Sequence, residues 1–135
     1  MSKPTTRIYI AKHTNDLYDI TGYMGNEDTS WVGYDLDRTL VAYDGWLGAD
    51  HIGDDQSLVC ERMARDLLDG KRVKIFTARC SDETGLNSIM SIDYITAWSW
   101  IKFGVKLEVT NVKDTRCVKI YDDIAINVNK GKINE

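Results

Sequence analysis

The sequence predicts an α/β fold built on a mostly parallel, doubly wound sheet. Short apolar stretches typical of strands alternate with longer segments in which apolar residues recur at helical spacing. This alternation indicates βαβ units, in which the strands run parallel and helices cover the sheet. We therefore expect a Rossmann-like, three-layer sandwich. The 135 residues fit one such domain, which we place at residues 31–135 after an N-terminal extension at residues 1–30.

The periodicity of each segment predicts the individual elements. Strands are expected at residues 31–35, 73–76, 105–109 and 118–121, and residues 124–128 could add another. Helices are expected at residues 56–69 and 91–103. Gly70 and Gly104 are natural stops for them, because glycine readily adopts the left-handed conformation after a helix. The buried stripe of the first helix would contain Leu58, Val59, Met63, Leu67 and Leu68. In the extension, residues 7–11 and 17–20 could form a β-hairpin.

Asp35 and Asp37 are the most informative residues, because they lie two positions apart where the first strand ends. Alternate residues of a strand point to the same side, so both carboxylates could reach one reacting group. An acidic surface turn or a calcium loop would give a similar local pattern. The EF-hand spacing fails, since Leu40 and Trp46 occupy the positions of the required glycine and glutamate. This segment alone does not distinguish a functional site from an acidic surface turn.

Three further segments place polar residues after expected strands. Thr77 follows the second strand, Lys113 follows the third, and Asp122 and Asp123 follow the fourth. Each has a simple structural explanation: a helix cap, a solvated side chain and a turn between two strands. Together they favour a functional site, because ligands of open α/β sheets bind at the carboxyl ends of the strands.

With these residues in this order, the chain resembles the haloacid dehalogenase-like (HAD) superfamily of phosphohydrolases over roughly residues 31–128. Residues 35–40, Asp-Leu-Asp-Arg-Thr-Leu, match the first motif of that superfamily, Asp-x-Asp-x-Thr-Leu/Val. Thr77, Lys113 and the acidic pair match the second, third and fourth motifs. Residues 109–114 and 121–123 look similar to small, capless members encoded by bacteriophages. Those members often carry Arg-Ala after the acidic pair, where this chain has Ile124 and Ala125.

The resemblance implies a Mg²⁺-dependent phosphomonoester hydrolase without a cap domain, for which the chain would be too short. Asp35 would attack phosphorus to give an aspartyl-phosphate, and Asp37 would act as the acid and base. Thr77 and Lys113 would hold the phosphoryl oxygens. Lys119 is a rival for the lysine role, and we favour Lys113 because a loop position reaches a phosphate more easily than a position inside a strand.

The resemblance also implies metal and substrate contacts. The metal ligands would be Asp35, the backbone carbonyl of Asp37, Asp122 and, in the outer shell, Asp123. Hard oxygen ligands of this kind suit Mg²⁺. Arg79 is a candidate substrate contact. Trp46 is another, because residues 42–55 stand where the superfamily has a flap over its active site; the aromatic ring could equally anchor that loop on the core.

The expected substrate is a nucleotide or another small phosphate monoester. One alternative is a polynucleotide 3′-phosphatase that acts on nucleic-acid ends, because the Thr77-Ala78-Arg79 and Asp122-Asp123 segments resemble the phosphatase domain of polynucleotide kinase-phosphatases. Another is a non-catalytic, metal-binding interaction module. The net charge of −4 argues against a surface that coats nucleic acid but leaves room for a local basic patch.

The remaining features of the sequence favour a cytoplasmic enzyme that acts away from membranes. We find neither a signal peptide nor an apolar run of membrane-spanning length. The three cysteines, Cys60, Cys80 and Cys117, support neither a disulfide framework nor a zinc motif. A homo-oligomer is compatible with the sequence.

Overall fold

The computed structural model describes residue 9, residues 29–81 and residues 85–134. The β-hairpin expected in the N-terminal extension lies outside these residues apart from Tyr9. The elements in chain order are β1 (Trp31–Tyr34), α1 (Ser57–Leu68), β2 (Arg72–Phe76), the 3₁₀ helix η2 (Ala78–Cys80), α2 (Leu86–Phe103), β3 (Glu108–Thr110), β4 (Cys117–Tyr121), β5 (Asn127–Asn129) and β6 (Lys132–Asn134). Neither α1 nor α2 has the length and apolar character needed to cross a membrane.

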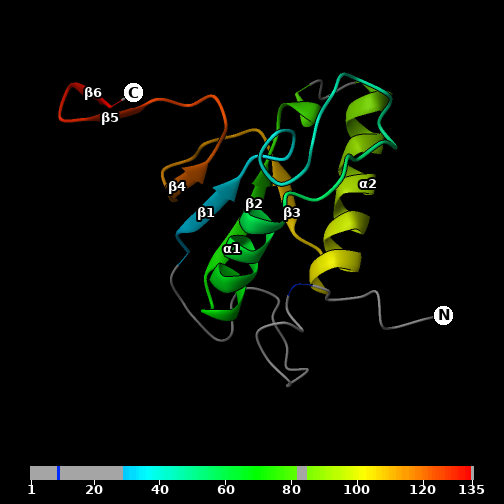
Figure 1. Cartoon of the computed structure of the whole chain (residues 1–135), viewed down its shortest axis with the longest axis horizontal. Coiled ribbons are helices and arrows are strands. Elements are labelled where there is room, and N and C mark those ends of the chain that lie inside the picture. The colour runs from blue at the N-terminus through cyan, green and yellow to red at the C-terminus, as the bar shows by residue number, and fades with distance from the viewer. Residues whose placement is uncertain (1–8, 10–28, 82–84, 135) are drawn as a thin grey trace.

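The first four strands form one parallel sheet in the order β3-β2-β1-β4. The chain runs outward from β1 to β2 and β3, and then returns to add β4 on the other side of β1 (Figure 1). The strand order therefore reverses between β1 and β4. In open α/β sheets, ligands bind at the carboxyl ends of strands at such a reversal. The expected α/β class and parallel sheet are confirmed.

One face of this sheet carries the hydrophobic core. Alternate residues of the two central strands point into it, and both helices add their buried side chains to the same cluster. Its strand members are Val32, Tyr34, Val73 and Ile75, and its helical members include Met63, Leu67, Ile95 and Phe103. On the opposite face, the side chain of Trp31 donates a hydrogen bond to Asp114 in the β3–β4 connection, at 2.8 Å. No helix in the described part of the chain covers that face, so the third layer of the sandwich stays a prediction.

Helix α2 begins at Leu86, five residues before the expected start at residue 91. Its first turns reverse the usual pattern, because Ser88 and Ser91 are buried whereas Leu86 and Ile89 are exposed. Apolar periodicity therefore fails at this end of the helix. Leu58 in α1 is also misassigned: it is 86% exposed, and the buried face of α1 is instead formed by Cys60, Met63, Ala64, Asp66 and Leu67.

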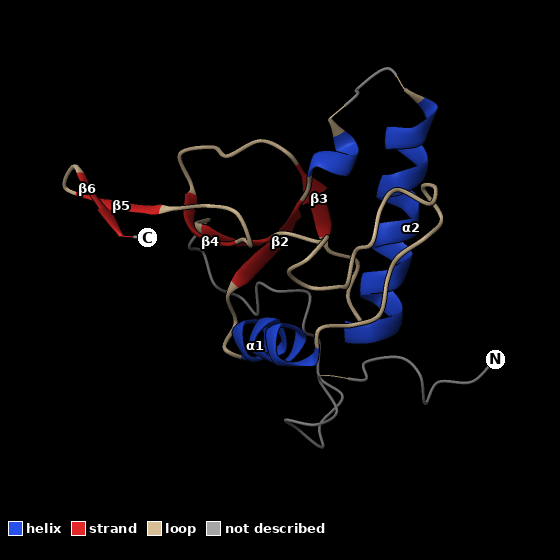
Figure 2. Ribbon diagram, turned by 45° about the horizontal axis from the view of Figure 1, so that its top comes forward, coloured by secondary structure: helices blue, strands red, loops and turns tan. Residues whose placement is uncertain are grey.

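Two strand expectations are also corrected. The third strand begins at Glu108 and not at residue 105. Val105 and Leu107 lie in the connection that follows Gly104, where their side chains are buried. The strand expected at residues 124–128 does not join the main sheet. Instead β5 pairs with β6 as a separate antiparallel hairpin, which Figure 2 shows apart from the four-stranded sheet.

A buried carboxylate links helix α1 to the central strand. Asp66 is 1% exposed, and Tyr34 Oη donates a hydrogen bond of 2.6 Å to its Oδ2. Arg62 and Lys71 lie 3.2 and 3.5 Å from Oδ1 as ion pairs rather than as aligned hydrogen bonds. Burial raises the pKa of Tyr34 far above its ordinary value, and the hydrogen bond to Asp66 raises it further. The hydroxyl therefore stays protonated and remains a donor. The Tyr34 ring stacks on that of Tyr121, with centroids 4.5 Å apart.

We expect Tyr34→Phe to lower the free energy of unfolding by about 1–3 kcal/mol, because Asp66 Oδ2 would lose its hydroxyl donor inside the core. Tyr121→Phe is the matched control. It removes a hydroxyl from the other ring of the same stack, and that hydroxyl accepts only an exposed, 3.3 Å hydrogen bond from Arg62. Urea unfolding of both variants measures the difference. Equal losses would contradict a special role for the buried hydrogen bond.

Candidate functional site

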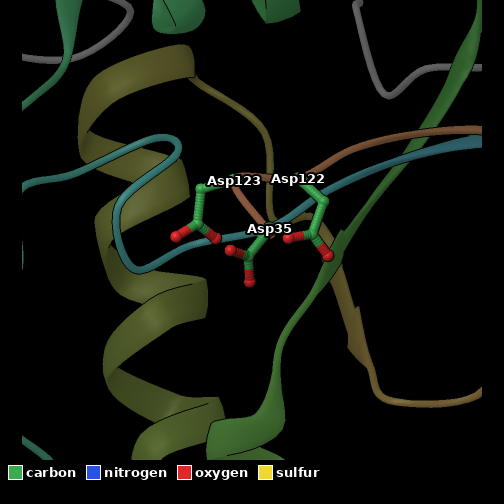
Figure 3. A group of neighbouring side chains, drawn as sticks. All are labelled: Asp35, Asp122 and Asp123. Atoms are coloured by element: carbon green, nitrogen blue, oxygen red, sulfur yellow. The ribbon is translucent and has the colours of Figure 1, made fainter. Parts of the chain in front are cut away.

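Three carboxylates meet at the carboxyl ends of β1 and β4 (Figure 3). Asp35 follows β1, and Asp122 and Asp123 follow β4. The two strands end level, because Tyr34 is the register partner of Tyr121 and the Asp35 amide donates to the Tyr121 carbonyl at 2.9 Å. One carboxylate oxygen from each aspartate lies within 4.8 Å of the others. The sheet thus brings together residues nearly ninety positions apart, as the sequence predicted for the acidic pair.

The closeness of these groups changes the chemistry of Asp35. Burial, followed by the negative charge of Asp122 and a hydrogen bond with Asp123, raises the pKa of Asp35 to about 7. The hydroxyl of Thr39 opposes this shift, since it donates to Asp35 Oδ2 at 3.2 Å. Asp122 is half-buried and Asp123 is exposed. Such a set of hard oxygen donors could hold a divalent cation such as Mg²⁺, which would relieve the repulsion among them.

A tight turn after β1 fixes the position of Asp35. The amide of Leu40 donates to the carbonyl oxygens of Asp35 and Leu36, and Leu36, Leu40 and Val41 are fully buried. Arg38 adopts a φ of 67°, which is unusual for a residue other than glycine. The buried leucines anchor the turn on the core, and Thr39 between them is itself buried, with its hydroxyl directed to Asp35. This arrangement explains how Thr39 comes to contact Asp35.

Asp37 belongs to a second cluster that faces Arg79. The Nε and Nη2 of Arg79 donate to the two carboxylate oxygens of Asp37, at 2.8 and 2.7 Å. The Nη1 of Arg79 donates to the His51 carbonyl at 2.8 Å, and the guanidinium carbon lies 5.2 Å from the centre of the Trp46 ring. The side chains of Arg79 and Asp37 are only 5% and 22% exposed. Arg79 therefore connects Asp37 to the loop at residues 42–55.

Trp46 thus contacts the Arg79 side chain, while the residue stays 49% exposed. Arg79 and Trp46 were both predicted as candidate substrate contacts, but the sequence did not indicate that they meet. It also did not indicate that Arg79 occupies both carboxylate oxygens of Asp37. The available signal was the position of Arg79 two residues after Thr77, which caps the 3₁₀ helix η2 that carries the arginine.

The base of the 42–55 loop is closed by backbone contacts. Val41 forms an isolated antiparallel bridge with Asp55, and the Ala42 amide donates to the Asp54 carbonyl at 2.8 Å. At Gly53, a Cβ atom would stand 2.0 Å from the Ala42 carbonyl oxygen, so glycine is required by close approach of the two backbones. The loop therefore leaves and rejoins the domain at one point.

The side chain of Asp55 then ties this base to other parts of the chain. Its Oδ2 accepts a hydrogen bond from Tyr9 Oη at 2.8 Å and lies 2.9 Å from the Lys102 ammonium. Tyr9 also stacks on Phe103 at the end of α2, with ring centroids 5.1 Å apart. One carboxylate thus joins the N-terminal segment, helix α2 and the loop that carries Trp46.

Thr77 and the two lysines lie outside the acidic cluster. Thr77 is 2% exposed, and its hydroxyl accepts a hydrogen bond from the Arg79 amide at 3.2 Å. It therefore caps η2, which is the helix-cap role considered for it in the sequence analysis. Lys113 and Lys119 are exposed, and both line a cavity of about 410 Å³ beside β4, together with Asp122. Lys119 Nζ lies 5.8 Å from the Tyr121 ring centre. No ion pair joins either lysine to a carboxylate of the cluster among the residues that are described.

We expect Arg79→Ala to lower the free energy of unfolding by about 1–3 kcal/mol, because the half-buried Asp37 carboxylate would lose both donors. Adding Asp37→Asn should then cost little more, since the two side chains form one unit. Urea unfolding of the wild type, both single variants and the double variant measures this coupling. Glu108→Gln is the control: it removes the ion pair between the exposed Glu108 and Lys74, whose ammonium still lies over the Trp31 ring, and should cost less than about 1 kcal/mol. Strictly additive losses from Arg79 and Asp37 would contradict the coupling.

No protein-family model, no curated protein and no solved structure matches the chain. The resemblance to the HAD superfamily therefore rests on the motif residues and their order.

Proposed function

We propose that the chain is a Mg²⁺-dependent phosphomonoester hydrolase that works through an aspartyl-phosphate on Asp35. The observation that carries this proposal is the meeting of Asp35, Asp122 and Asp123 at the reversal of strand order. Support also comes from the order of the motif residues, which resembles that of HAD phosphohydrolases. The donor set fits the metal, since all three side chains offer hard carboxylate oxygens.

Asp35 would act as the nucleophile. The turn after β1 holds the backbone of Asp35, and the Thr39 hydroxyl donates to Oδ2 of its carboxylate. A bound Mg²⁺ would supply charge that stabilises the phosphoryl oxygens and keeps the neighbouring carboxylates ionised. Asp35 would attack phosphorus while the bond from phosphorus to the leaving oxygen breaks, and water would later hydrolyse the resulting acyl phosphate to release phosphate and restore the Asp35 carboxylate.

Asp37 would supply the proton to the leaving oxygen and take one from the attacking water. In the structure its carboxylate is engaged by Arg79 on both oxygens. A phosphate group offers the same planar guanidinium a bidentate partner of higher charge. We therefore propose that the substrate phosphate takes over contacts of Arg79 and thereby frees an oxygen of Asp37 for proton transfer.

The substrate class is part of the same proposal. The proposed substrate is a small phosphate monoester such as a nucleotide. A polynucleotide 3′-end is the competing substrate, and Arg79 would serve either. Phosphate release from a panel of phosphorylated metabolites and of 3′- and 5′-phosphorylated oligonucleotides, each with Mg²⁺, distinguishes the two.

We expect phosphate release on the best substrate of that panel to require a divalent cation and Asp35. EDTA should abolish turnover and added Mg²⁺ should restore it, while Asp35→Asn should remove nearly all activity because no carboxylate remains to attack phosphorus. Asp93→Asn is the control, since Asp93 is exposed on α2 and lies outside the acidic cluster. Activity that survives complete metal removal, or near wild-type turnover by Asp35→Asn, would refute the proposed mechanism.

The lysine role gives a separate prediction. Lys113→Ala should lower kcat/KM by about 100-fold or more, because the proposed contact stabilises charge that concentrates on the phosphoryl oxygens. Lys119→Ala should change kcat/KM little, since Lys119 lies within β4 and its ammonium lies over the Tyr121 ring. Steady-state kinetics on one substrate compares the two variants. The opposite ranking would assign the role to Lys119.

A further inference from the structure

The aromatic side chains of the loop that carries Trp46 lie beside the candidate site and outside the hydrophobic core. Ile52 packs against the core, whereas neither Tyr43 nor Trp46 belongs to the core cluster of the described residues. Each of the two rings instead has a guanidinium group over it. The guanidinium carbon of Arg38 is 5.2 Å from the centre of the Tyr43 ring, and that of Arg79 is 5.2 Å from the centre of the Trp46 ring. The loop is therefore anchored without the Trp46 ring.

Trp46 and Leu47 form the exposed tip of the same loop. The two residues are 49% and 68% exposed. They lie between Gly45 and Gly48, whose φ angles of 124° and 115° are conformations that other residues rarely adopt. Because the Arg79 guanidinium lies over one face of the indole ring, the exposed remainder of the ring offers an aromatic surface to a ligand.

The proposed mechanism places the organic part of the substrate on the Trp46 side of the site. Asp37 would give its proton to the leaving oxygen, so that oxygen must come within hydrogen-bond distance of the Asp37 carboxylate. Arg79 donates to both oxygens of this carboxylate and also lies over the Trp46 ring. The cavity beside β4 shares Asp122 with the acidic cluster, but Asp37, Arg79 and Trp46 are not among its lining residues. The leaving group is therefore expected at the loop.

We propose that the substrate is a phosphate monoester of a nucleoside and that its base stacks on the exposed part of the Trp46 ring. This inference rests on the proposed function, because the acid role of Asp37 defines where the leaving group lies. Neighbouring groups would then bind the two ends of the substrate: Arg79 the phosphate, and Trp46 the base. Stacking requires only a planar ring, so bases of different identity would be accepted. A sugar phosphate has no such ring and would lose this contact.

Two pairs of substrates, each differing by one base alone, test the stacking contact. The first pair is adenosine 5′-monophosphate and ribose 5-phosphate. The second is a 3′-phosphorylated oligonucleotide and the same oligonucleotide with an abasic terminal residue. In one of the pairs, we expect the wild-type KM to be at least about 10-fold lower for the member with the base. The first pair would identify a free nucleotide as the source of the base, and the second a nucleic-acid end.

Trp46→Ala should remove most of this KM ratio, and Trp46→Phe should restore most of it because phenylalanine keeps an aromatic face. The ratio isolates the base, since an effect of Trp46 on Arg79 would change the KM values of both members of a pair. Steady-state kinetics of the three proteins on both pairs measures it. A wild type without a preference for the base in either pair, or a preference that Trp46→Ala leaves unchanged, would overturn the proposal.

Trp100→Ala is the matched control. Trp100 is 39% exposed on α2, and the Lys106 ammonium lies 6.0 Å from the centre of its ring. It therefore resembles Trp46 in its exposure and in its cationic neighbour, but it is outside the acidic cluster and the contacts of Arg79. Its replacement should leave the KM ratio unchanged. A ratio that falls equally in Trp100→Ala and in Trp46→Ala would also overturn the proposal.

Equilibrium binding separates this inference from the proposed catalysis. Asp35→Asn lacks the nucleophile, so calorimetry with Mg²⁺ can measure the binding of each ligand without turnover. This variant should bind the member with the base at least about 10-fold more tightly, and adding Trp46→Ala should remove the preference. A Trp46-dependent preference in a protein that releases no phosphate would refute the phosphatase and support the stacking site. An active phosphatase without that preference, or no binding of either ligand that carries the base, would refute the stacking site.

Discussion

The hydrogen bond from the Asp35 amide to the Tyr121 carbonyl, 2.9 Å long, continues the pairing of β1 with β4 past the ends of both strands. Every feature of the acidic cluster depends on this pairing. It places a residue that follows the first strand beside two that follow the fourth, although the chain between them forms the rest of the domain. A shift of register by one residue would turn Tyr121 to the wrong face and separate the carboxylates.

The clusters on either side of Asp35 differ in electrostatic balance. On the β4 side, three acidic groups face one another and no base of the described residues is ion-paired with them; burial, followed by the charge of Asp122, raises the pKa of Asp35. On the β2 side, one carboxylate is matched by one guanidinium. The two halves of a single short sequence motif, Asp35 and Asp37, therefore experience opposite environments only two residues apart. Environments that differ so strongly are typical of paired carboxylates with different roles.

The sequence predicted those features that depend on neighbours along the chain. Asp35, Asp122 and Asp123 directly follow apolar segments typical of strands. They could therefore be assigned to the carboxyl edge of one parallel sheet. The start of α2 could not be predicted, because Ser88 and Ser91 face inward where apolar residues are expected. The contact of Arg79 with Asp37 and Trp46 was equally out of reach, since it joins segments over thirty residues apart. Such contacts depend on loop conformations that residue types alone do not encode.

Asp55 connects Tyr9 to the loop that contacts Arg79. Tyr9 donates to the carboxylate that also holds Lys102, at the point where the 42–55 loop rejoins the domain. That loop supplies both the Trp46 ring and the His51 carbonyl that contact Arg79. An affinity tag or a deletion close to Tyr9 is therefore connected to Arg79 through one carboxylate and one loop. A change that removed the Tyr9 hydroxyl would leave Lys102 as the remaining partner of Asp55 Oδ2 at the base of that loop.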